Sequence, residues 1–425
     1  SLSRSSSTRN IRSPQVTPKR VVATLPASQK KNSSTPGSVY SGRSEKSADV
    51  CLSSDEIQPK GDTAFSNFNL EEEHFKAENC AVTVAVRVRP FSKREVNEKA
   101  VQVVFMNGQE TTVQHPDSKQ NYIFCYDFSF WSFEKSQPSF VGQASVYEKL
   151  AVPLLEWSLL GYNTCLFAYG QTGSGKSYTM MGFDGEPGII PRFCSDLFSR
   201  IQATMKQKLS FHLEISYFEV YNEKIHDLLI FKAENGQKKQ PPFVFWEQIT
   251  AFCILQSWLE LGNKQRATAA TGMNDKSSRS HSVFTLVMTQ TKTEYVDGQE
   301  HDHRITSRIN LVDLAGSERC STAQTSGERL KEGVSINKSL LTLGKVISAL
   351  SENSQTRKKT FIPYRESVLT WLLKESLGGN SKTSMIATIS PAATNMEETL
   401  STLRYAKQAR LIINVAKVNE DLNAK

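Results

Sequence analysis

A glycine-rich stretch near the middle of the chain constrains the fold more than any other feature. It fits the pattern G-x-x-x-x-G-K-[ST] and consists of Gly170, Gln171, Thr172, Gly173, Ser174, Gly175, Lys176 and Ser177. A short apolar run, Cys165 to Ala168, comes before it and predicts a buried strand. Glycines in such a loop let backbone amides curl around a phosphate without Cβ clashes. The pattern therefore predicts a nucleotide-binding loop between a strand and a helix.

Two side chains at the end of this loop predict how the phosphates are held. Lys176 places a cation near the β- and γ-phosphate oxygens, and the Ser177 hydroxyl can ligate Mg²⁺. The helix that follows directs its positive end at the phosphates. These residues indicate a nucleotide with Mg²⁺, but not the work that the nucleotide does.

A second motif, Asp313 to Glu318, follows the apolar run "INLV". Asp313 at the end of such a strand can hold Mg²⁺ through water. The amide of Gly316 can donate to the γ-phosphate, so that its bond is present before hydrolysis and absent afterwards. This is the logic of a γ-phosphate sensor.

A third motif, Asn274 to His281, reads "NDKSSRSH" and stands just before a predicted strand. On its own it is equally consistent with a polar turn containing capping serines. The base-reading motif of GTPases, N-K-x-D, has no match, since Asn263–Lys264 continues with Gln265–Arg266 and Asn337–Lys338 with Ser339–Leu340. ATP is therefore favoured over GTP.

Strand and helix patterns alternate over the ordered part of the chain. Expected strands are "AVTVAVRVRPF" ending at Pro90, "TTVQHP", "IFCYDFSFW", "TCLFAY", "SFHLEISYFEVYN", "VFTLVMTQTKTEY" and "SRINLVDLAG". Expected helices are "QASVYEKLAVPLLEWSLLGY", "INKSLLTLGKVISALSE", "RESVLTWLLKESLG" and "ETLSTLRYAKQARLI". This order predicts an α/β fold with a central mixed, mainly parallel sheet flanked by helices on both faces.

The first 75 residues differ from the rest in composition. Residues 1–50 carry nine Lys or Arg and two acids, and so hold +7 of the net charge of +8. Few apolar residues are present to offset the entropy of ordering, so we expect residues 1–75 to be disordered. Ser13, Thr17 and Thr35 each precede Pro, which suits proline-directed kinases.

Other classes are disfavoured by what the sequence lacks. Seven scattered Cys without a CxxC argue against zinc and against a disulfide scaffold, and favour a reducing compartment. No run approaches the ~18 apolar residues of a membrane helix, and no signal peptide opens the chain. Because the chain begins without Met, we expect it to be part of a longer protein.

Taken together, "VAVRVRPF", "GQTGSGKSYTM", "NDKSSRSH", "NLVDLAGSE" and "IPYRESVLTWLLKESLGGNSKT" resemble the kinesin motor domain from about Asn79 to Asn423. "YNEKIHDLL" and "GNKQRATAATGMN" resemble the third kinesin class, and in particular its mitotic, cytokinesis-acting member. The resemblance implies a kinesin-like P-loop NTPase fold. It divides the chain into a basic Ser/Pro-rich extension (1–75), a motor domain (76–409) and a neck linker (410–425).

The resemblance also implies roles for single residues. ATP and Mg²⁺ are the implied cofactors, with Arg87, Arg89 and Pro90 around the adenine and Tyr178 stacked on it. Ser278 and, through water, Asp313 would join Ser177 at the metal. The implied catalytic set is Ser277, Ser278, Arg279, Asp313, Gly316 and Glu318, with Ser277 holding the attacking water and Arg279 pairing with Glu318.

The implied partner is the microtubule. Arg329 and Lys331 would contact tubulin, as would Arg357, Lys358, Lys359 and Arg365, since a basic loop suits an acidic surface. Two features depart from the family pattern. The stretch 240–255 lacks the usual strand and loop, and Val368 and Trp371 stand where many relatives carry basic residues. Asn419 stands where the family has a docking latch for the neck linker.

The sequence thus predicts a microtubule-stimulated ATPase motor that docks its neck linker and moves toward microtubule plus ends in mitosis or cytokinesis. The alternative is a microtubule-bound ATPase that tethers or bundles with little motility. We expect a location on cytoplasmic and spindle microtubules or in the nucleus, and a tail bound by a spindle or microtubule partner. No nucleic-acid partner is indicated, and a dimerisation segment would lie outside this chain.

Overall fold

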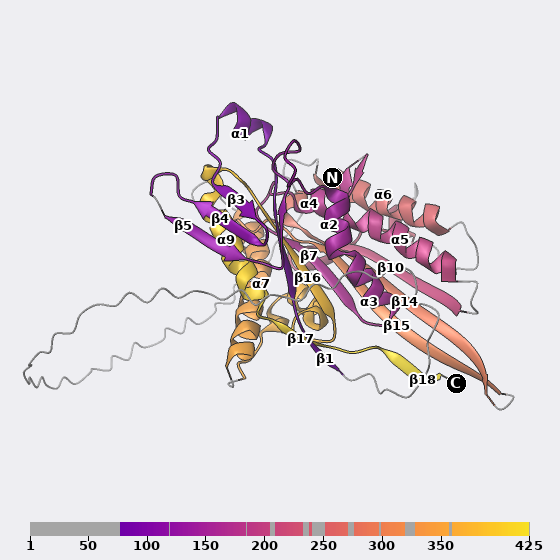
Figure 1. Ribbon diagram of the computed structural model, residues 1–425. Coiled ribbons are helices and arrows are strands. Elements are labelled where there is room, and N and C mark those ends of the chain that lie inside the picture. Colours follow the sequence, from indigo (N-terminus) through magenta and orange to yellow (C-terminus); the bar gives the residue numbers. More distant parts are fainter. Residues whose placement is uncertain are drawn as a thin grey trace, which may run out of the picture. The chain divides into compact units, whose positions relative to one another are not determined.

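The computed structural model describes residues 77–118, 120–183, 185–204, 209–232, 238–239, 251–270, 276–296, 299–318, 328–356 and 359–424. A large twisted sheet runs through the centre of this part of the chain (Figure 1). Its strands follow the order β11-β10-β14-β15-β7-β16-β2-β6, and β18 also pairs with β15. Their bounds are β2 Thr83–Val88, β6 Phe128–Trp131, β7 Thr164–Tyr169, β10 Leu209–Tyr221, β11 Lys224–Asp227, β14 His281–Val296, β15 Gln299–Asp313, β16 Lys382–Ile389 and β18 Glu420–Ala424.

Helices cover the two faces of this sheet. One face carries α7 (Glu328–Gln355), α8 (Val368–Leu372) and α9 (Met396–Ala409). The other carries α2 (Gln143–Leu150), α3 (Val152–Leu159), α4 (Lys176–Met180), α5 (Ile189–Thr204) and α6 (Ala251–Ala270). The two sets lie on opposite sides of the sheet in Figure 1.

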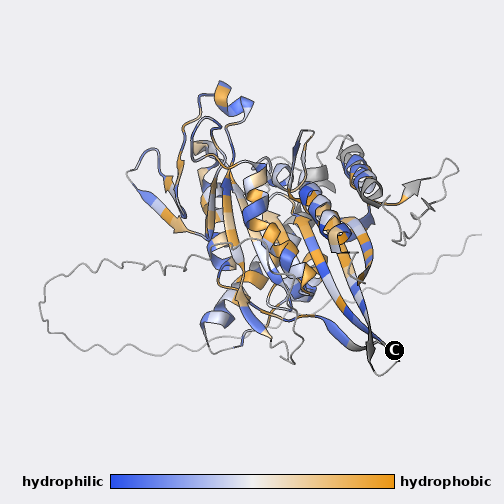
Figure 2. Cartoon of the chain, turned by 45° about the vertical axis from the view of Figure 1, so that its right-hand side comes forward, coloured by the Kyte–Doolittle hydropathy of each residue, from blue (hydrophilic) through white to orange (hydrophobic). Residues whose placement is uncertain are grey.

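The side-chain alternation of the central strands supplies a core to each face. In β7, Phe167 and Tyr169 pack toward α7 and α9, whereas Leu166 and Ala168 pack toward α3 and α5. Because both faces are covered, β7 is buried at every position, which explains why "TCLFAY" has no polar residue after Thr164 other than the Tyr169 hydroxyl. Figure 2 shows hydrophobic residues concentrated on these inner strands and on the inward sides of the helices.

Short strands form smaller sheets beside the main one. β1 (Glu78–Ala81) pairs antiparallel with β17 (Ile413–Ala416), which brings the start of the described chain to its end. The remaining pairs join β3 (Val104–Asn107), β4 (Glu110–Gln114) and β5 (Asn121–Cys125), β8 (Gly182–Phe183) with β9 (Glu186–Pro187), and β12 (Phe231–Lys232) with β13 (Lys238–Lys239). One further short helix, α1, spans Lys93–Asn97.

The predicted α/β class is confirmed, with a difference in the sheet. Around β7 the pairings are parallel, as predicted: β15–β7, β16–β7, β16–β2 and β2–β6. The other half is antiparallel, so "mainly parallel" was wrong in emphasis. The reason is the long antiparallel hairpin of β14 and β15, because β10 pairs antiparallel with β14 and β18 pairs antiparallel with β15.

The helices also differ in detail from the sequence patterns. The predicted helix from Gln143 to Tyr162 is two helices, because Pro153 in the first turn of α3 cannot continue the hydrogen bonding of α2. The helix predicted from Arg365 narrows to α8 flanked by 3₁₀ turns. Most of the unusual stretch 240–255 lies outside the described residues. None of the described helices is both long and apolar enough to cross a membrane.

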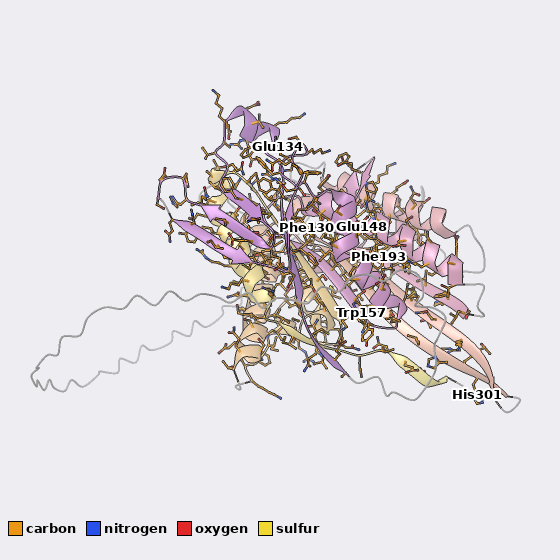
Figure 3. All side chains as sticks on the ribbon, viewed as in Figure 1. Phe130, Glu134, Glu148, Trp157, Phe193 and His301 are labelled. Atoms are coloured by element: carbon orange, nitrogen blue, oxygen red, sulfur yellow. The ribbon has the colours of Figure 1, made fainter. Side chains whose placement is uncertain are left out.

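The core predicts one stability result. Phe193 on α5 is fully buried, and Phe193→Ala should lower the free energy of unfolding by about 3–5 kcal/mol because it leaves a cavity (Figure 3). Phe361→Ala is the matched control, since that ring is 83% exposed and its loss should change stability by about 0.5 kcal/mol or less. Urea unfolding followed by circular dichroism measures both. Equal effects of the two substitutions would contradict this assignment of the core.

Candidate nucleotide site

The site begins where two parallel strands end side by side. β7 and β15 pair in register with Ala168 opposite Asp313, and the amide of Leu314 donates to the Ala168 carbonyl at 3.3 Å. The glycine-rich loop follows β7 directly, and the Asp313 motif follows β15. The carboxyl ends of parallel strands are where α/β sheets bind ligands. Two motifs separated by about 140 residues in sequence therefore share one edge of the sheet.

The loop conformation requires glycine at specific points. Gly170 has φ +149°, and a Cβ there would lie 2.2 Å from the carbonyl oxygen of Thr388 on β16. Gly175 has φ +104° and forms the N-cap of α4. Both positions disfavour any side chain, through strain at each and a backbone clash at the first. The loop is thus held close against β16 while it turns into the helix.

Lys176 is buried within the loop that it belongs to. Its ammonium donates to the carbonyls of Gly170 and Gln171, both at 2.8 Å. Burial lowers the pKa of Lys176, while the Asp313 and Glu318 carboxylates act in the opposite direction. The cation is thus already at the loop, with carboxylates nearby that favour its charged form.

Asp313 and a third residue, both buried, meet Ser177, which is exposed. The Ser177 hydroxyl donates to Asp313 Oδ2 at 2.6 Å, and the Arg266 guanidinium donates to the same oxygen at 2.8 Å. Asp313 is 1% exposed, and its other oxygen, Oδ1, has no hydrogen-bond partner among the described residues. A hydroxyl beside an unpartnered carboxylate oxygen is the hard-oxygen set that Mg²⁺ or its water prefers. These residues fit the predicted metal.

Arg266 was not predicted from the sequence. It lies on α6, and burial alone would lower its pKa, but the Asp313 carboxylate raises it, so the guanidinium stays charged. In the sequence, Arg266 was notable only because it stands where the N-K-x-D motif of GTPases would require Asp after Asn263–Lys264. A lone Arg in a helix gives no sign of which carboxylate it will meet.

The third and second sequence motifs, within 274–281 and 313–318, are here called the two switches; they contact one another, and the second also contacts the loop. The Gly316 amide donates to the Ser278 carbonyl at 2.8 Å. The Glu318 carboxylate accepts hydrogen bonds from the amide of Thr172, at 2.7 Å, and from its hydroxyl. Ser278 and Arg279 lie in a 3₁₀ turn, Lys276–Arg279, directly before β14. The pairing of Arg279 with Glu318 stays a prediction, and the side chain of Ser277 lies outside the described residues.

His281 joins the switches to α7. Its Nδ1 accepts from the amide of Ala315 at 3.0 Å, so Nε2 carries the proton and lies 2.7 Å from the Ser339 hydroxyl. Burial lowers the pKa of His281 to about 3. The ring is therefore neutral near pH 7, in the one tautomer that matches its neighbours. Part of the "SSRSH" motif is thus a structural link, which the sequence did not predict.

The predicted adenine residues lie together but differ in accessibility. Arg87 is 4% exposed and donates to Ser132, Gln143 and Thr179, while its guanidinium stacks 5.2 Å from the centre of the Tyr178 ring. Burial lowers the pKa of Arg87 to about 10. Its hydrogen bonds to the protein interior indicate that Arg87 positions Tyr178. Direct contact of Arg87 with a base stays a prediction.

Arg89 connects the loop to α1. Its Nε donates to the carbonyl of Gly173 at 2.7 Å. Its two other nitrogens donate to the Glu95 carboxylate at 2.6 and 2.8 Å. These hydrogen bonds are the main reason that the pKa of Glu95 falls to about 2. Glu95 also closes the capping box of α1 with Ser92. Pro90 follows at an exposed position. Arg89 therefore lies beside the loop, and contact of Arg89 or Pro90 with adenine stays a prediction.

The predicted microtubule contacts are only partly within the described side chains. Lys359 and Arg365 are exposed, and the Arg365 guanidinium lies 5.1 Å from the centre of the Trp371 ring. The side chains of Arg329, Lys331, Arg357 and Lys358 lie outside the described residues.

Comparison with known proteins decides the family. The family model described as the kinesin motor domain matches residues 87–412, which include the loop and both switches. The chain belongs to the kinesin family. It is 70% identical over 382 residues to human kinesin-like protein KIF14, with 87% of this chain and 23% of the relative aligned. It is 49% identical over 363 residues to unc-104 of Caenorhabditis elegans, with 81% and 23% aligned.

Solved structures agree with this assignment. A KIF14 dimer with AMP-PNP in complex with a microtubule has a TM-score of 0.74 and 72% identity, covering 82% of this chain and 98% of that one. A fast kinesin has a TM-score of 0.67 and 35% identity, covering 81% and 95%. The chain spans about a quarter of the length of the curated relatives KIF14 and unc-104.

The buried imidazole predicts a pH dependence of stability. The folded state keeps His281 neutral down to about pH 3, whereas an unfolded chain protonates it near 6.5. Stability from His281 is therefore complete above pH 6.5 and falls by up to about 1.4 kcal/mol per unit as pH drops toward 3. His281→Gln removes this term but leaves the other titrating groups. The stability difference between wild type and variant should thus shrink from pH 7 to pH 4. A constant difference would contradict the assignment.

Proposed function

We propose that this chain is an ATP-hydrolysing motor that binds microtubules and moves along them. The observation that carries the proposal is the junction of Ser177, Asp313 and Arg266, with Lys176 beside it. The end of the glycine-rich loop meets the start of the Asp313 motif there, which supports a phosphate loop beside a metal-binding oxygen pair and a γ-phosphate sensor. Phosphoryl transfer to water depends on such positioning and charge neutralisation more than on covalent chemistry by the protein.

We assign each site residue a role in this reaction. Mg²⁺, when bound by Ser177, Ser278 and the water-mediated Asp313, would supply neutralising charge to the phosphates. Lys176 would move its hydrogen bonds from loop carbonyls to the β- and γ-phosphate oxygens. Ser277 would hold the attacking water, and the Arg279–Glu318 pair would close the switches over it. Gly316 would exchange its bond to the Ser278 carbonyl for one to the γ-phosphate.

The C-terminal segment is a part of the chain that could move when the nucleotide changes, which favours a motor over a tether. Residues 413–424 lie along the core, with β17 paired to β1 and β18 paired to β15. The Asn419 side chain donates to Gly161, Asn163 and Thr306, at 3.0–3.2 Å. A ligand that favours one of two positions of such a segment would shift it between docked and released states. This arrangement supports the predicted neck linker and its latch at Asn419.

The relatives support the choice of track and of cell biology. KIF14, at 70% identity, is named in complex with a microtubule, so we propose the microtubule as this chain's partner as well. We likewise propose plus-end-directed movement, a role in mitosis or cytokinesis, and a location on spindle microtubules. The basic residues 1–75 are proposed as a tail for a microtubule or spindle partner, regulated by proline-directed kinases.

Substitution of the metal ligand tests the proposal. Ser177→Asn should reduce microtubule-stimulated ATP hydrolysis at least 100-fold, because the larger amide displaces both the metal and the Asp313 contact. Ser195→Asn on the exposed surface of α5 is the matched control and should keep the wild-type rate. A steady-state phosphate-release assay with and without microtubules measures both. Unchanged turnover in Ser177→Asn would overturn the site.

The sensor glycine gives an independent test. A Cβ at Gly316 would lie 2.2 Å from Thr172 Oγ1 and 2.4 Å from a Glu318 oxygen, so Gly316→Ala should separate the switches from the loop. We expect loss of surface gliding while microtubule co-sedimentation in ADP is retained. Gliding at the wild-type speed would contradict the sensor role. If the wild-type protein itself co-sediments with microtubules but does not glide them, that result would instead support the tether alternative.

A further inference from the structure

Lys382 occupies an aromatic enclosure that the nucleotide site does not use. Its ammonium lies 4.3 Å from the centre of the Trp157 ring and 5.2 Å from that of Tyr162. The two rings meet edge to face, with centres 5.3 Å apart. Glu78 on β1 completes the enclosure at 2.5 Å from the ammonium, and the lysine side chain is only 11% exposed. Two π faces and a carboxylate around one cation form a specific binding arrangement.

The enclosure lies where the C-terminal segment meets the core. Trp157 stands at the end of α3, at the side of the molecule where β18 runs (Figure 3). Tyr162 forms an isolated bridge with Val418, and the Asn419 amide donates to the Gly161 carbonyl at 3.0 Å. A Cβ on Gly161 would lie 2.8 Å from Val418, so the turn is packed directly against the docked segment.

The same lysine also reaches the strand that pairs with this segment. Glu78 is the first residue of β1 and lies opposite Ala416 of β17 in the antiparallel pair. Its side chain is 55% exposed, and its ion pair with Lys382 joins β1 to the core strand β16. Lys382 therefore touches both sides of the docking site: β1 through Glu78, and the turn under Val418 through Tyr162.

We propose that Lys382, Trp157, Tyr162 and Glu78 form a clasp that makes β1 and the C-terminal segment dock together. The clasp is a positioning device, not part of the nucleotide site. When the segment docks, β17 brings β1 and Glu78 to Lys382, and the aromatic rings hold the ammonium in place to receive them. The inference rests on the proposed function, because docking has a use only in a motor.

The magnitude expected of the clasp is modest and therefore suits a switch. An ion pair with a half-exposed carboxylate and an ammonium held by aromatic faces each contribute little, together on the order of a fivefold bias in an equilibrium. A bias of that size favours docking without preventing release. Since the carboxylate is half exposed, the bias should also weaken as salt is added.

Spin labelling of the C-terminal segment tests the clasp. A genetically encoded nitroxide amino acid replaces Val415, which is 46% exposed on β17, and electron paramagnetic resonance gives the immobilised fraction. Lys382→Met should lower the docked-to-undocked ratio about fivefold, with AMP-PNP and without nucleotide alike. Lys382→Arg, which keeps the cation, should stay within about twofold of wild type. Glu78→Gln should give part of the loss, and adding it to Lys382→Met should cause no further loss.

Controls separate this inference from the function on which it rests. Glu98→Gln removes a carboxylate whose exposure, 50%, is close to the 55% of Glu78 and which pairs with Arg94 on α1, and it should leave the ratio unchanged. Microtubule-stimulated ATP hydrolysis should stay near the wild-type rate in Lys382→Met, since the clasp is not in contact with the nucleotide site. A docked ratio unchanged in both Lys382→Met and Glu78→Gln would overturn the clasp and leave the motor assignment intact. A ratio that ignores nucleotide in wild type, yet falls in these variants, would support the clasp and count against the motor.

Discussion

The parallel pairing of β7 with β15 is the constraint on which the rest of the structure depends. It sets Asp313 opposite Ala168, one strand away from the phosphate loop, and so fixes the carboxylate beside Ser177. The register also positions the segments that follow the two strands. The loop turns into α4, and Gly316 reaches the Ser278 carbonyl. A slip of one residue would direct Asp313 to the other face of the sheet and separate these groups.

The strand β15 also connects the nucleotide site with the other end of the core. β15 runs from the hairpin near His301, through its pairing with β18, to Asp313 (Figure 3). One rigid element therefore contacts both the C-terminal segment and the nucleotide site. His281 adds a second route, since its ring bridges the Ala315 amide and Ser339 on α7. A packed element with two contact states is the physical basis for coupling distant sites.

Much of this could be predicted from the sequence, and the failures have physical causes. Local motifs predicted the loop, Asp313 and the central strands, because glycine spacing and apolar runs can be recognised within a few consecutive residues. Arg266 and the clasp at Lys382 could not be foreseen, since each depends on partners far away in sequence. The pairing of β1 with β17 was missed because four mostly exposed residues carry no hydrophobic pattern. Sheet direction was misjudged because a run of β-branched residues looks the same in a long hairpin as in a parallel strand.

The central claim is that the state of the nucleotide site decides whether residues 413–424 are docked. Hydrogen–deuterium exchange of this chain on microtubules, compared between ADP and AMP-PNP, measures it most directly. Amides of β17, which bond to β1 and to the Gly379 carbonyl, should be protected with AMP-PNP and exchange freely with ADP, and those of β18 should follow. Equal protection of these amides in the two nucleotides, with the loop amides of Gly173 and Ser174 protected in both, would contradict the account.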